Sequence, residues 1–237
     1  MLTVRWWQER LYPPQRAKNP AAVFSEELYR HVKPDSRVLD IGAGAGKANT
    51  YALRGKCAEV VGIDLDPRVL ENPLLDRGVV GNMMDTPFDG NSFDVAFSIY
   101  TLEHVTSPAA FVTELHRIIK PGGRFLALTP NRYHYVSLVA SCTPHAFHRW
   151  FNRKRGRCDE DTFSTVYQLN TKRALNRCFL SRGFEQVLFK TIEVEPNYLK
   201  WCVPAFLCGT LYERLVNSTG LLEFLRVNII CGYAKNT

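Results

Sequence analysis

The sequence lacks paired cysteines and long hydrophobic runs. Its seven cysteines are scattered over 237 residues without any C-x-x-C pair, which is typical of a reducing compartment and excludes a disulfide scaffold or zinc ribbon. No window reaches the roughly 18 consecutive apolar residues that a membrane-spanning helix requires, and charges interrupt the N-terminal stretch before a signal-peptide core forms. We therefore expect a cytoplasmic protein that does not cross a membrane.

The composition is that of a folded protein. Hydrophobic residues make up 46% of the chain and charged residues 22%, which excludes disordered and fibrous classes, and the length suits one domain with insertions. The formal net charge is +7 and the isoelectric point is about 9.1. This basic excess suits an anionic partner, such as phosphate, a lipid headgroup or nucleic acid, without choosing among them.

Apolar runs alternate with helical segments in the order of an α/β sheet. Strands are predicted from Arg37 into a glycine turn and over residues 59–66, 78–81, 93–100, 124–129, 184–194 and 227–234, and helices over 47–55, 108–119 and 171–182. The first strand, turn, helix and second strand form a βαβ unit. We therefore expect a Rossmann-like, doubly wound α/β fold.

The segments outside this repeat are interpreted as insertions. We expect a single domain over residues 1–237, with a core of 36–131, 171–194 and 227–235 and insertions over 131–170 and 195–226. Because loops positioned by a rigid scaffold usually carry specificity, we expect both insertions to cover the substrate side of the sheet.

A glycine-rich turn follows the first predicted strand, and an aspartate follows the second. Asp40 precedes Gly42, Gly44 and Gly46, whose missing Cβ atoms let the backbone pass close to a ligand. Asp64 stands about 20 residues after the turn, where a carboxylate accepts hydrogen bonds from both hydroxyls of a ribose. Together these features predict a nucleotide-like cofactor.

Two other nucleotide-binding motifs are excluded by spacing. A P-loop requires a glycine five positions before Gly46 and a hydroxyl two positions after it, but Ile41 and Ala48 stand there. The alternating glycines also depart from the G-x-G-x-x-G spacing of nicotinamide-binding folds. The pattern therefore favours neither an NTPase nor a dehydrogenase.

Four segments in order resemble the successive motifs of class I S-adenosylmethionine-dependent methyltransferases: VLDIGAGAG, VVGIDLD, GNMMDTPFDGNSFDVAFSIYTLEHV and ELHRIIKPGGRFLALTPN. The resemblance covers residues 36–131 and is greatest to methyltransferases of type 11, near the branch of ubiquinone and menaquinone biosynthesis. It implies a seven-stranded, mostly parallel sheet whose last strand is antiparallel. It also implies S-adenosylmethionine as the cofactor, bound across the carboxyl ends of the first and fourth strands.

The resemblance further implies which residues contact the cofactor. By position it assigns Asp40, Gly42, Gly44 and Gly46 to the methionine part, Asp64 with Leu65 to the ribose side, Asn82 and Met83 to adenine, and the strand end at Ser98 to the sulfonium. Asn82 stands where the family usually has an aspartate. Its amide oxygen can still accept a hydrogen bond from adenine, and Asp85 or a purely local turn role for Asn82 are the alternatives.

Methyl transfer from a sulfonium depends mainly on in-line positioning, so a catalytic side chain is not required. If the acceptor is a hydroxyl, His104 is the first candidate base because it follows the fourth strand; helix-start packing is its alternative role. His134, His145 and His148 are further candidates. Cys142 shares a three-residue spacing with the last two, but four ligands are needed for zinc and no fourth is evident, so no metal is predicted.

The insertions suggest the partners. Residues 148–157 hold five cations and no acid, and residues 206–216 carry apolar side chains at near-helical spacing. They suit either an anionic membrane surface with a lipid-linked acceptor, reached from the inner face, or a solvated loop and a lid packed on the sheet. The sequence does not indicate an oligomeric state.

The acceptor is expected to be an oxygen on a small, lipid-linked or saccharide-linked molecule, by analogy with the family. A nucleic-acid (RNA) methyltransferase is the alternative enzyme, although the chain has no N-P-P-Y-type tetrapeptide after the fifth strand. A catalytically silent cofactor-binding or scaffold protein is the alternative from another class. The intact acidic and glycine positions of the cofactor motifs disfavour it.

Overall fold

The computed structural model describes residues 3–13, 19–46, 51–142 and 165–237. The chain divides into two compact units. The sheet unit comprises the described residues of Ala21–Thr129, Thr165–Lys190 and Ile229–Thr237. The helical unit comprises those of Met1–Pro20, Pro130–Ser164 and Thr191–Asn228. That all of residues 1–237 act as one domain stays a prediction.

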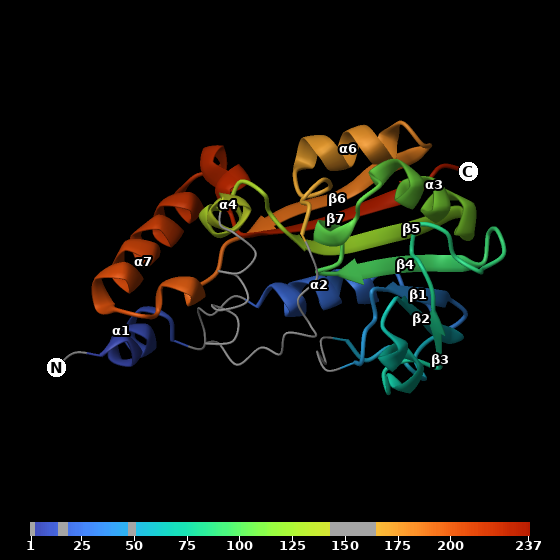
Figure 1. Cartoon of the computed structure of the whole chain (residues 1–237), viewed down its shortest axis with the longest axis horizontal. Helices are drawn as coiled ribbons and strands as arrows, with labels where there is room; N and C mark the ends of the chain where they lie inside the picture. The colour runs from blue at the N-terminus through green and yellow to red at the C-terminus, as the bar shows by residue number, and fades with distance from the viewer. Residues whose placement is uncertain (1–2, 14–18, 47–50, 143–164) are drawn as a thin grey trace. The chain divides into compact units, whose positions relative to one another are not determined.

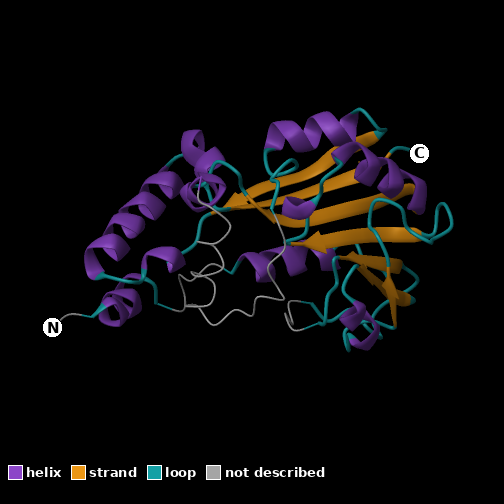
Figure 2. Ribbon diagram, in the orientation of Figure 1, coloured by secondary structure: helices purple, strands orange, loops and turns teal. Residues whose placement is uncertain are grey.

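The sheet unit is built on a seven-stranded sheet (Figure 2). Its strands are β1 (Arg37–Ile41), β2 (Glu59–Asp64), β3 (Arg77–Val80), β4 (Phe93–Ile99), β5 (Ile119–Pro130), β6 (Phe184–Ile192) and β7 (Asn228–Lys235). Their order is β3-β2-β1-β4-β5-β7-β6. β1 to β6 are parallel and β7 is antiparallel. This topology confirms the predicted Rossmann-like, doubly wound fold.

The central strands β1 and β4 are buried because they consist largely of apolar residues. Every residue of β1 after Arg37 is buried. β1 pairs with β2 on one side and with β4 on the other, and Asp40 lies opposite Phe97 and Ile41 opposite Ser98. The carboxyl ends of β1 and β4 therefore meet where the strand order reverses, which is where open α/β sheets bind ligands.

Helices cover both faces of the sheet (Figure 1). They are α2 (Pro20–Tyr29), α3 (Pro108–Ile118) and α6 (Lys172–Leu180). On the α2 face, Phe24 packs against Phe97 of β4 with ring centroids 6.2 Å apart. On the opposite face, Phe179 of α6 stacks on Phe125 of β5 at 5.4 Å. Aromatic pairs of this kind add packing energy to the apolar area that they bury.

β5 begins earlier than the sequence indicates. The Lys-Pro-Gly-Gly segment at 120–123 predicts a stop and then a strand from Arg124, whereas the strand starts at Ile119. The register between β4 and β5 shifts once along this stretch. Gly122 has left-handed backbone at φ +74° and accommodates the extra residues. The segment is therefore an irregular part of the strand rather than a loop before it.

The helix predicted over residues 47–55 is not found in its described part. Residues 47–50 lie outside the described chain, and residues 51–55 form no helix. The amide of Ala52 instead donates to the hydroxyl of Tyr29 at 2.9 Å. The prediction was wrong for 51–55 because a side chain distant in the sequence binds this backbone, which the local pattern does not reveal.

The helical unit contains three α-helices among its described residues. They are α1 (Val4–Leu11), α4 (Tyr135–Cys142) and α7 (Val203–Ser218), accompanied by short helices η4 (Asn197–Leu199) and η5 (Gly220–Leu225). Tyr12, which follows α1, donates to Glu213 of α7 at 3.2 Å, and its ring lies 6.0 Å from that of Phe206. The residues of α1 itself are not buried. The apolar pattern of the helix therefore did not predict that the adjoining Tyr12 packs on α7.

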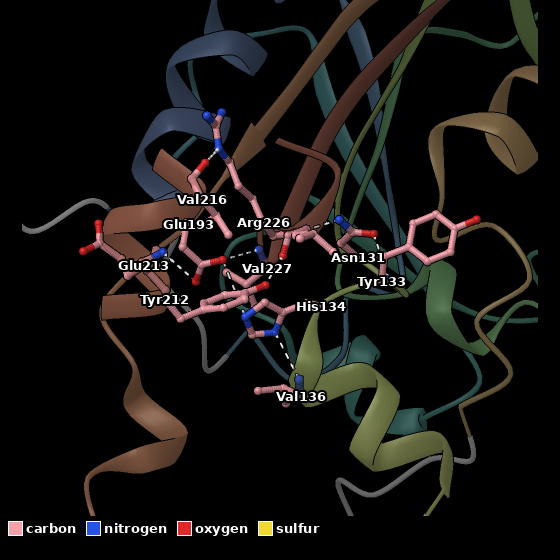
Figure 3. A network of polar contacts seen from close by, with 12 residues as sticks. Asn131, Tyr133, His134, Val136, Glu193, Tyr212, Glu213, Val216, Arg226 and Val227 are labelled. Carbon is pink, nitrogen blue, oxygen red and sulfur yellow. Dashed lines mark hydrogen bonds and ion pairs between the residues drawn. The ribbon is translucent and has the colours of Figure 1, made fainter. Parts of the chain in front are cut away.

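A buried polar network in the helical unit joins the segments where the insertions begin and end (Figure 3). Asn131 donates to the carbonyl oxygens of Phe224 and Arg226 at 2.7 and 2.8 Å. Glu193 is 4% exposed and accepts from the amide of Val227 at 2.9 Å. These bonds hold the three segments together, because buried polar groups left unpaired are costly.

His134, one of the alternative candidate bases, belongs to this network (Figure 3). Its side chain is 2% exposed. Nδ1 accepts from the amide of Val136 at 3.3 Å, and Nε2 lies 3.5 Å from Glu193 Oε2. Both ring nitrogens face groups of the helical unit, and a role for this histidine as a base stays a prediction.

α7 exposes part of the apolar face that the sequence places at residues 206–216. Phe206 and Val216 are buried, whereas Leu211 and Leu215 are 71% and 56% exposed. None of the helices in the described parts of the chain is long and apolar enough to span a bilayer. The basic run at 148–157 lies outside the described residues.

Lys235 anchors the last strand, and its replacement is expected to destabilise the fold. Its ammonium donates to Asn91 Oδ1 at 3.0 Å and to the carbonyl oxygens of His116 and Ile119 at 2.7 and 2.8 Å. Lys235→Met removes these donors from a largely buried position. The change should therefore lower the free energy of unfolding by about 2–3 kcal/mol, because it removes hydrogen bonds to a charged group.

Lys190→Met is the matched control, because the ammonium of Lys190 is half-exposed where it meets Glu27. Glu27 keeps its ion pair with Arg30 in this variant, so this loss should be the smaller one, at about 0–1 kcal/mol. Urea denaturation of both variants measures the difference. Equal losses would show that the contacts of Lys235 do not anchor β7.

Candidate cofactor site

The glycine turn after β1 has the backbone that its sequence predicts. Gly42, Gly44 and Gly46 have φ of +78°, +50° and +68°, values that other residues rarely adopt. A Cβ at Gly42 or Gly46 would overlap a neighbouring side chain. A Cβ at Gly44 would meet its nearest atom, Asp64 Oδ2, at 3.9 Å. Gly42 and Gly46 therefore allow close packing within the protein, whereas Gly44 faces open space.

Two side chains that the sequence analysis did not single out hold this turn. Asn72 Nδ2 donates to the carbonyl oxygens of Ala43 and Gly44 at 3.0 and 3.2 Å. Thr101 Oγ1 donates to the carbonyl oxygen of Ile41 at 3.2 Å. Asn72 caps the C-terminal end of the short helix η1 (Pro67–Glu71). Because asparagine side chains often bind backbone groups at turns, this residue could have been predicted from the sequence to hold a turn.

Asp64 ends β2 and faces the turn. Its Oδ2 accepts from the amide of Gly44 at 2.8 Å, and its Oδ1 accepts from the amide of Asp66 at 2.9 Å. A carboxylate offers about four lone-pair sites, so further donors can bind. The aspartate thus shapes the turn and keeps capacity for the hydroxyls of a ribose.

Asp40 is a buried acid beneath the turn. It is 4% exposed and accepts a hydrogen bond from the hydroxyl of Tyr51. Burial, with a smaller effect from the charge of Asp64, raises the pKa of Asp40 to about 7. Burial disfavours the ionised form of an acid, and a nearby cation restores it. The site therefore suits a positively charged ligand group.

Ser98 and Leu65 also lie at strand ends of this edge. Ser98 is fully buried, and its Oγ has no hydrogen-bond partner among the described residues. Buried polar atoms are rarely left unpaired, so this hydroxyl suits a polar ligand. Leu65 is 63% exposed directly after Asp64 and offers an apolar surface beside the acid.

Asn82 and Met83 follow β3. Asn82 is exposed, and its Oδ1 accepts from the amide of Met84 at 3.0 Å, a local turn bond that asparagine commonly forms. The amide group has a second lone pair and two donors, so contact with adenine stays a prediction. Met83 is partly buried against the hydrophobic core.

The predicted cofactor residues of the sheet unit meet at one edge. Asp40, Asp64 and Ser98 lie at or near the carboxyl ends of β1, β2 and β4, which are neighbours in the sheet. His104 is half-buried in the short helix η2 (Leu102–His104), directly after β4. Its role as a base stays a prediction.

Two of the other candidate histidines cannot be compared with this edge. His145 and His148 lie outside the described residues, as does the basic run that follows them. Across the described parts of both units, no group of three or more His, Cys, Asp or Glu side chains could hold a metal ion.

Residues 39–127, which span this edge and the strands that build it, match the family described as a methyltransferase domain. The chain contains a class I S-adenosylmethionine-dependent methyltransferase domain. The sheet unit that contains the matched residues has the seven-stranded topology expected for the class. Its match lies in the sheet unit, where the cofactor residues were predicted.

Relatives of the methyltransferase domain include enzymes of quinone biosynthesis. The chain is 36% identical over 109 residues to the ubiquinone/menaquinone biosynthesis C-methyltransferase UbiE of Ectopseudomonas mendocina, covering 41% of this chain and 43% of that protein. It is 35% identical over 147 residues to the ubiquinone biosynthesis O-methyltransferase of Hahella chejuensis, covering 55% and 58%. The chain thus spans about half the length of these relatives.

The fold is also similar to that of a protein in a solved complex. The structure is that of a Haloferax volcanii protein in complex with the Trm112 methyltransferase activator. The TM-score is 0.61 at 19% sequence identity, and the alignment covers 98% of this chain and 95% of that chain. At this identity the likeness supports the fold.

S-adenosylmethionine fits the residues of the methyltransferase domain, and the cofactor prediction is confirmed. The buried carboxyl of Asp40 suits a cationic group, and the open space at Gly44 lets a ligand approach the backbone. Asp64 has lone pairs for hydroxyls, and the hydroxyl of Ser98 has no partner within the described parts of the chain. Which atom of the cofactor each residue contacts stays a prediction.

Asp40→Asn is expected to stabilise the unliganded protein at pH 8. The folded-state pKa of Asp40 is raised from 3.8 to about 7, so folding favours the protonated acid. That stabilisation is complete below about pH 4 and is lost as the pH rises through about 7. At pH 8 the neutral amide should therefore raise the free energy of unfolding, by at most about 4 kcal/mol.

The same variant should bind S-adenosylhomocysteine at least about tenfold more weakly at pH 8, because a charge-assisted hydrogen bond is lost. Thermal unfolding at pH 5 and pH 8, with and without this ligand, measures both effects. Asp35→Asn is the control, because Asp35 is exposed. A lower melting temperature for the Asp40 variant at pH 8 would refute the burial argument.

Proposed function

We propose that the protein transfers the methyl group of S-adenosylmethionine to an oxygen of a small, lipid-linked or saccharide-linked acceptor. The observation that carries this proposal is the gathering of Asp40, Gly44, Asp64 and Ser98 at one sheet edge. The similarity to the Hahella O-methyltransferase over 147 residues supports an oxygen acceptor. Because UbiE is a C-methyltransferase, carbon is the alternative.

The chemistry asks the protein mainly to position its reactants. The methyl carbon is already activated by the sulfonium, so a bound acceptor needs an in-line approach rather than covalent catalysis. Asp40 and Ser98 would hold the methionine part, Asp64 and Leu65 the ribose side, and Asn82 and Met83 the adenine. His104 is the base that the sequence pattern favours for a hydroxyl acceptor.

We propose that the helical unit provides acceptor specificity. The chain passes from the carboxyl end of β5 into this unit at Pro130 and from β6 at Thr191. Segments that follow strand ends commonly carry binding residues. Replacement of residues 203–225 by the matching helix of a methyltransferase with another acceptor should change the product without changing cofactor affinity.

Metabolite analysis tests the proposed function. Cells with the gene, cells without it, and cells carrying Gly44→Val are compared by mass spectrometry of small molecules, lipids and RNA nucleosides. We expect a product heavier by one CH₂ unit in the small-molecule or lipid fraction of the first strain alone. A methylated nucleoside would indicate the nucleic-acid alternative, and no difference in any fraction would favour a silent cofactor-binding protein.

We also propose that the protein contacts an anionic membrane surface from the cytoplasm. The exposed Leu211 and Leu215 of α7 and Leu221 of η5, which is 85% exposed, support it, as do the five cations at 148–157 in the sequence. Each cation near such a surface contributes about 1 kcal/mol, and salt screens the attraction.

Co-sedimentation with liposomes tests this contact. Binding to anionic liposomes should be strong at low salt, weaker at high salt, and reduced when Leu211 and Leu215 are changed to Ser or when Arg153, Lys154 and Arg155 are changed to Ser. Failure of the parent to sediment with anionic liposomes at low salt would refute the membrane contact and leave a soluble acceptor.

A further inference from the structure

Glu103 is a buried acid that the cofactor motifs do not use. It lies in η2, after β4, and is 6% exposed. Its Oε2 accepts from Thr129 Oγ1 at 3.3 Å. In the described parts of the chain no charged partner shifts its pKa, which burial raises to about 7. A buried carboxyl without a cation is costly to ionise, so Glu103 gives up and takes up a proton near neutral pH.

Its contacts join three segments of the sheet unit. Asn170 Nδ2 donates to Thr129 Oγ1 at 2.7 Å. The backbone carbonyl of Glu103 accepts from the amides of Val166 and Tyr167 at 2.8 and 3.2 Å. The acid thus lies among the ends of β4 and β5 and the segment that leads into α6. This is the edge that holds Ser98, whose position the family resemblance places beside the sulfonium.

The backbone next to Glu103 supplies a second observation. Tyr100 has φ +55° and Tyr167 has φ +50°, a region that a bulky residue rarely adopts. Both flank the acid, one before it in the chain and one on the segment bonded to its carbonyl. Strained backbone of this kind concentrates at functional sites.

We propose that Glu103 is the catalytic base that accepts the proton of the acceptor hydroxyl. This inference rests on the proposed function. As the acceptor oxygen attacks the methyl carbon, its O–H proton moves to the Glu103 carboxylate. The carbon–sulfur bond breaks and its electron pair stays on sulfur. The products are a methyl ether, S-adenosylhomocysteine and a neutral Glu103, which returns its proton to solvent.

The surroundings of Glu103 suit a base that works near neutral pH. Among the described residues, the groups that bind its carboxyl are Thr129 from β5 and its own backbone amide, and neither carries a charge. His104 follows Glu103 in η2, and Tyr167 lies on the segment whose amides bind the Glu103 carbonyl oxygen. Because the carboxyl must be ionised to accept a proton, the rate should rise with pH up to about 7 and then level off.

The pH dependence of methyl transfer tests the proposal. Labelled S-adenosylmethionine at saturating concentration is mixed with a small-molecule and lipid extract of cells that lack the gene, from pH 5.5 to 8.5. Glu103→Gln should lower the rate at pH 8 by about 100-fold or more and abolish its rise with pH. S-adenosylhomocysteine affinity should stay within about twofold, which separates the base from the binding of the cofactor.

Two further variants make the outcome decisive. Glu103→Asp keeps a carboxylate and should restore part of the rise with pH, even if Glu103→Gln folds poorly. His104→Gln should keep that rise. A rise kept in Glu103→Gln and lost in His104→Gln would assign the base to His104 and overturn the proposal. No label transferred by the parent would overturn the proposed function, and this inference with it.

Discussion

Gly44→Val is expected to abolish binding of S-adenosylmethionine while leaving the sheet unit folded. The Cβ position at Gly44 has 3.9 Å to its nearest protein atom, so the added side chain enters the space that the cofactor needs. The left-handed φ of +50° adds a conformational cost of about 1–2 kcal/mol. The loss of binding is thus expected to exceed the loss of stability.

Circular dichroism and thermal shift separate the two effects. Gly44→Ala carries the same backbone cost with a smaller side chain and should retain part of the affinity. Gly42→Val overlaps Thr101 and should instead disturb folding. If folded Gly44→Val still gains melting temperature from the cofactor, the turn does not lie where we place the cofactor.

Asp64→Ala is expected to weaken cofactor binding by about 1–3 kcal/mol, because charge-assisted hydrogen bonds to the ribose are lost. Part of the effect comes from the turn itself, since the carboxylate also accepts from the amides of Gly44 and Asp66. Asp64→Asn keeps an acceptor without the charge and should lose less.

Equilibrium dialysis with labelled cofactor measures the affinities of the parent and both Asp64 variants. The expected order is parent, then the Asn variant, then the Ala variant. Equal affinities for all three proteins would show that Asp64 does not contact the cofactor. The assignment of the glycine turn to the cofactor site would still stand.

The sequence predicted most of the sheet because its signals are local. The strand positions follow from apolar runs, and the left-handed backbone of the turn follows from glycines that only a tight turn requires. Gly44 and Asp64 could be placed together because the carboxyl ends of neighbouring parallel strands share one edge. The same logic placed His104 directly after β4, as observed.

The features that the sequence did not predict depend on contacts between distant residues. Asn72 donates a hydrogen bond to Ala43, 29 positions away, and Asp40 accepts a hydrogen bond from the hydroxyl of Tyr51. Local sequence patterns do not indicate such pairs. The failed helix at 51–55 has the same cause, because the bond from Ala52 to Tyr29 is tertiary.

The helical unit was the least predictable part for a related reason. Its apolar face at 206–216 was visible in the sequence, but the contacts of Tyr12 with Phe206 and Glu213 join residues that are far apart in the chain. The polar network of Asn131 and Glu193 joins residues that lie 34 and 95 positions apart along the chain. Closing loops of this length costs little entropy, and no local motif indicates the pairing.

Calorimetric titration of the purified parent protein with S-adenosylmethionine tests the central claim most directly. We expect saturable binding of one cofactor per chain, competition by S-adenosylhomocysteine, and no heat with NAD or ATP. Absence of binding by the folded parent, or equal binding of NAD, would contradict the assignment of the glycine turn, Asp40 and Asp64 to this cofactor.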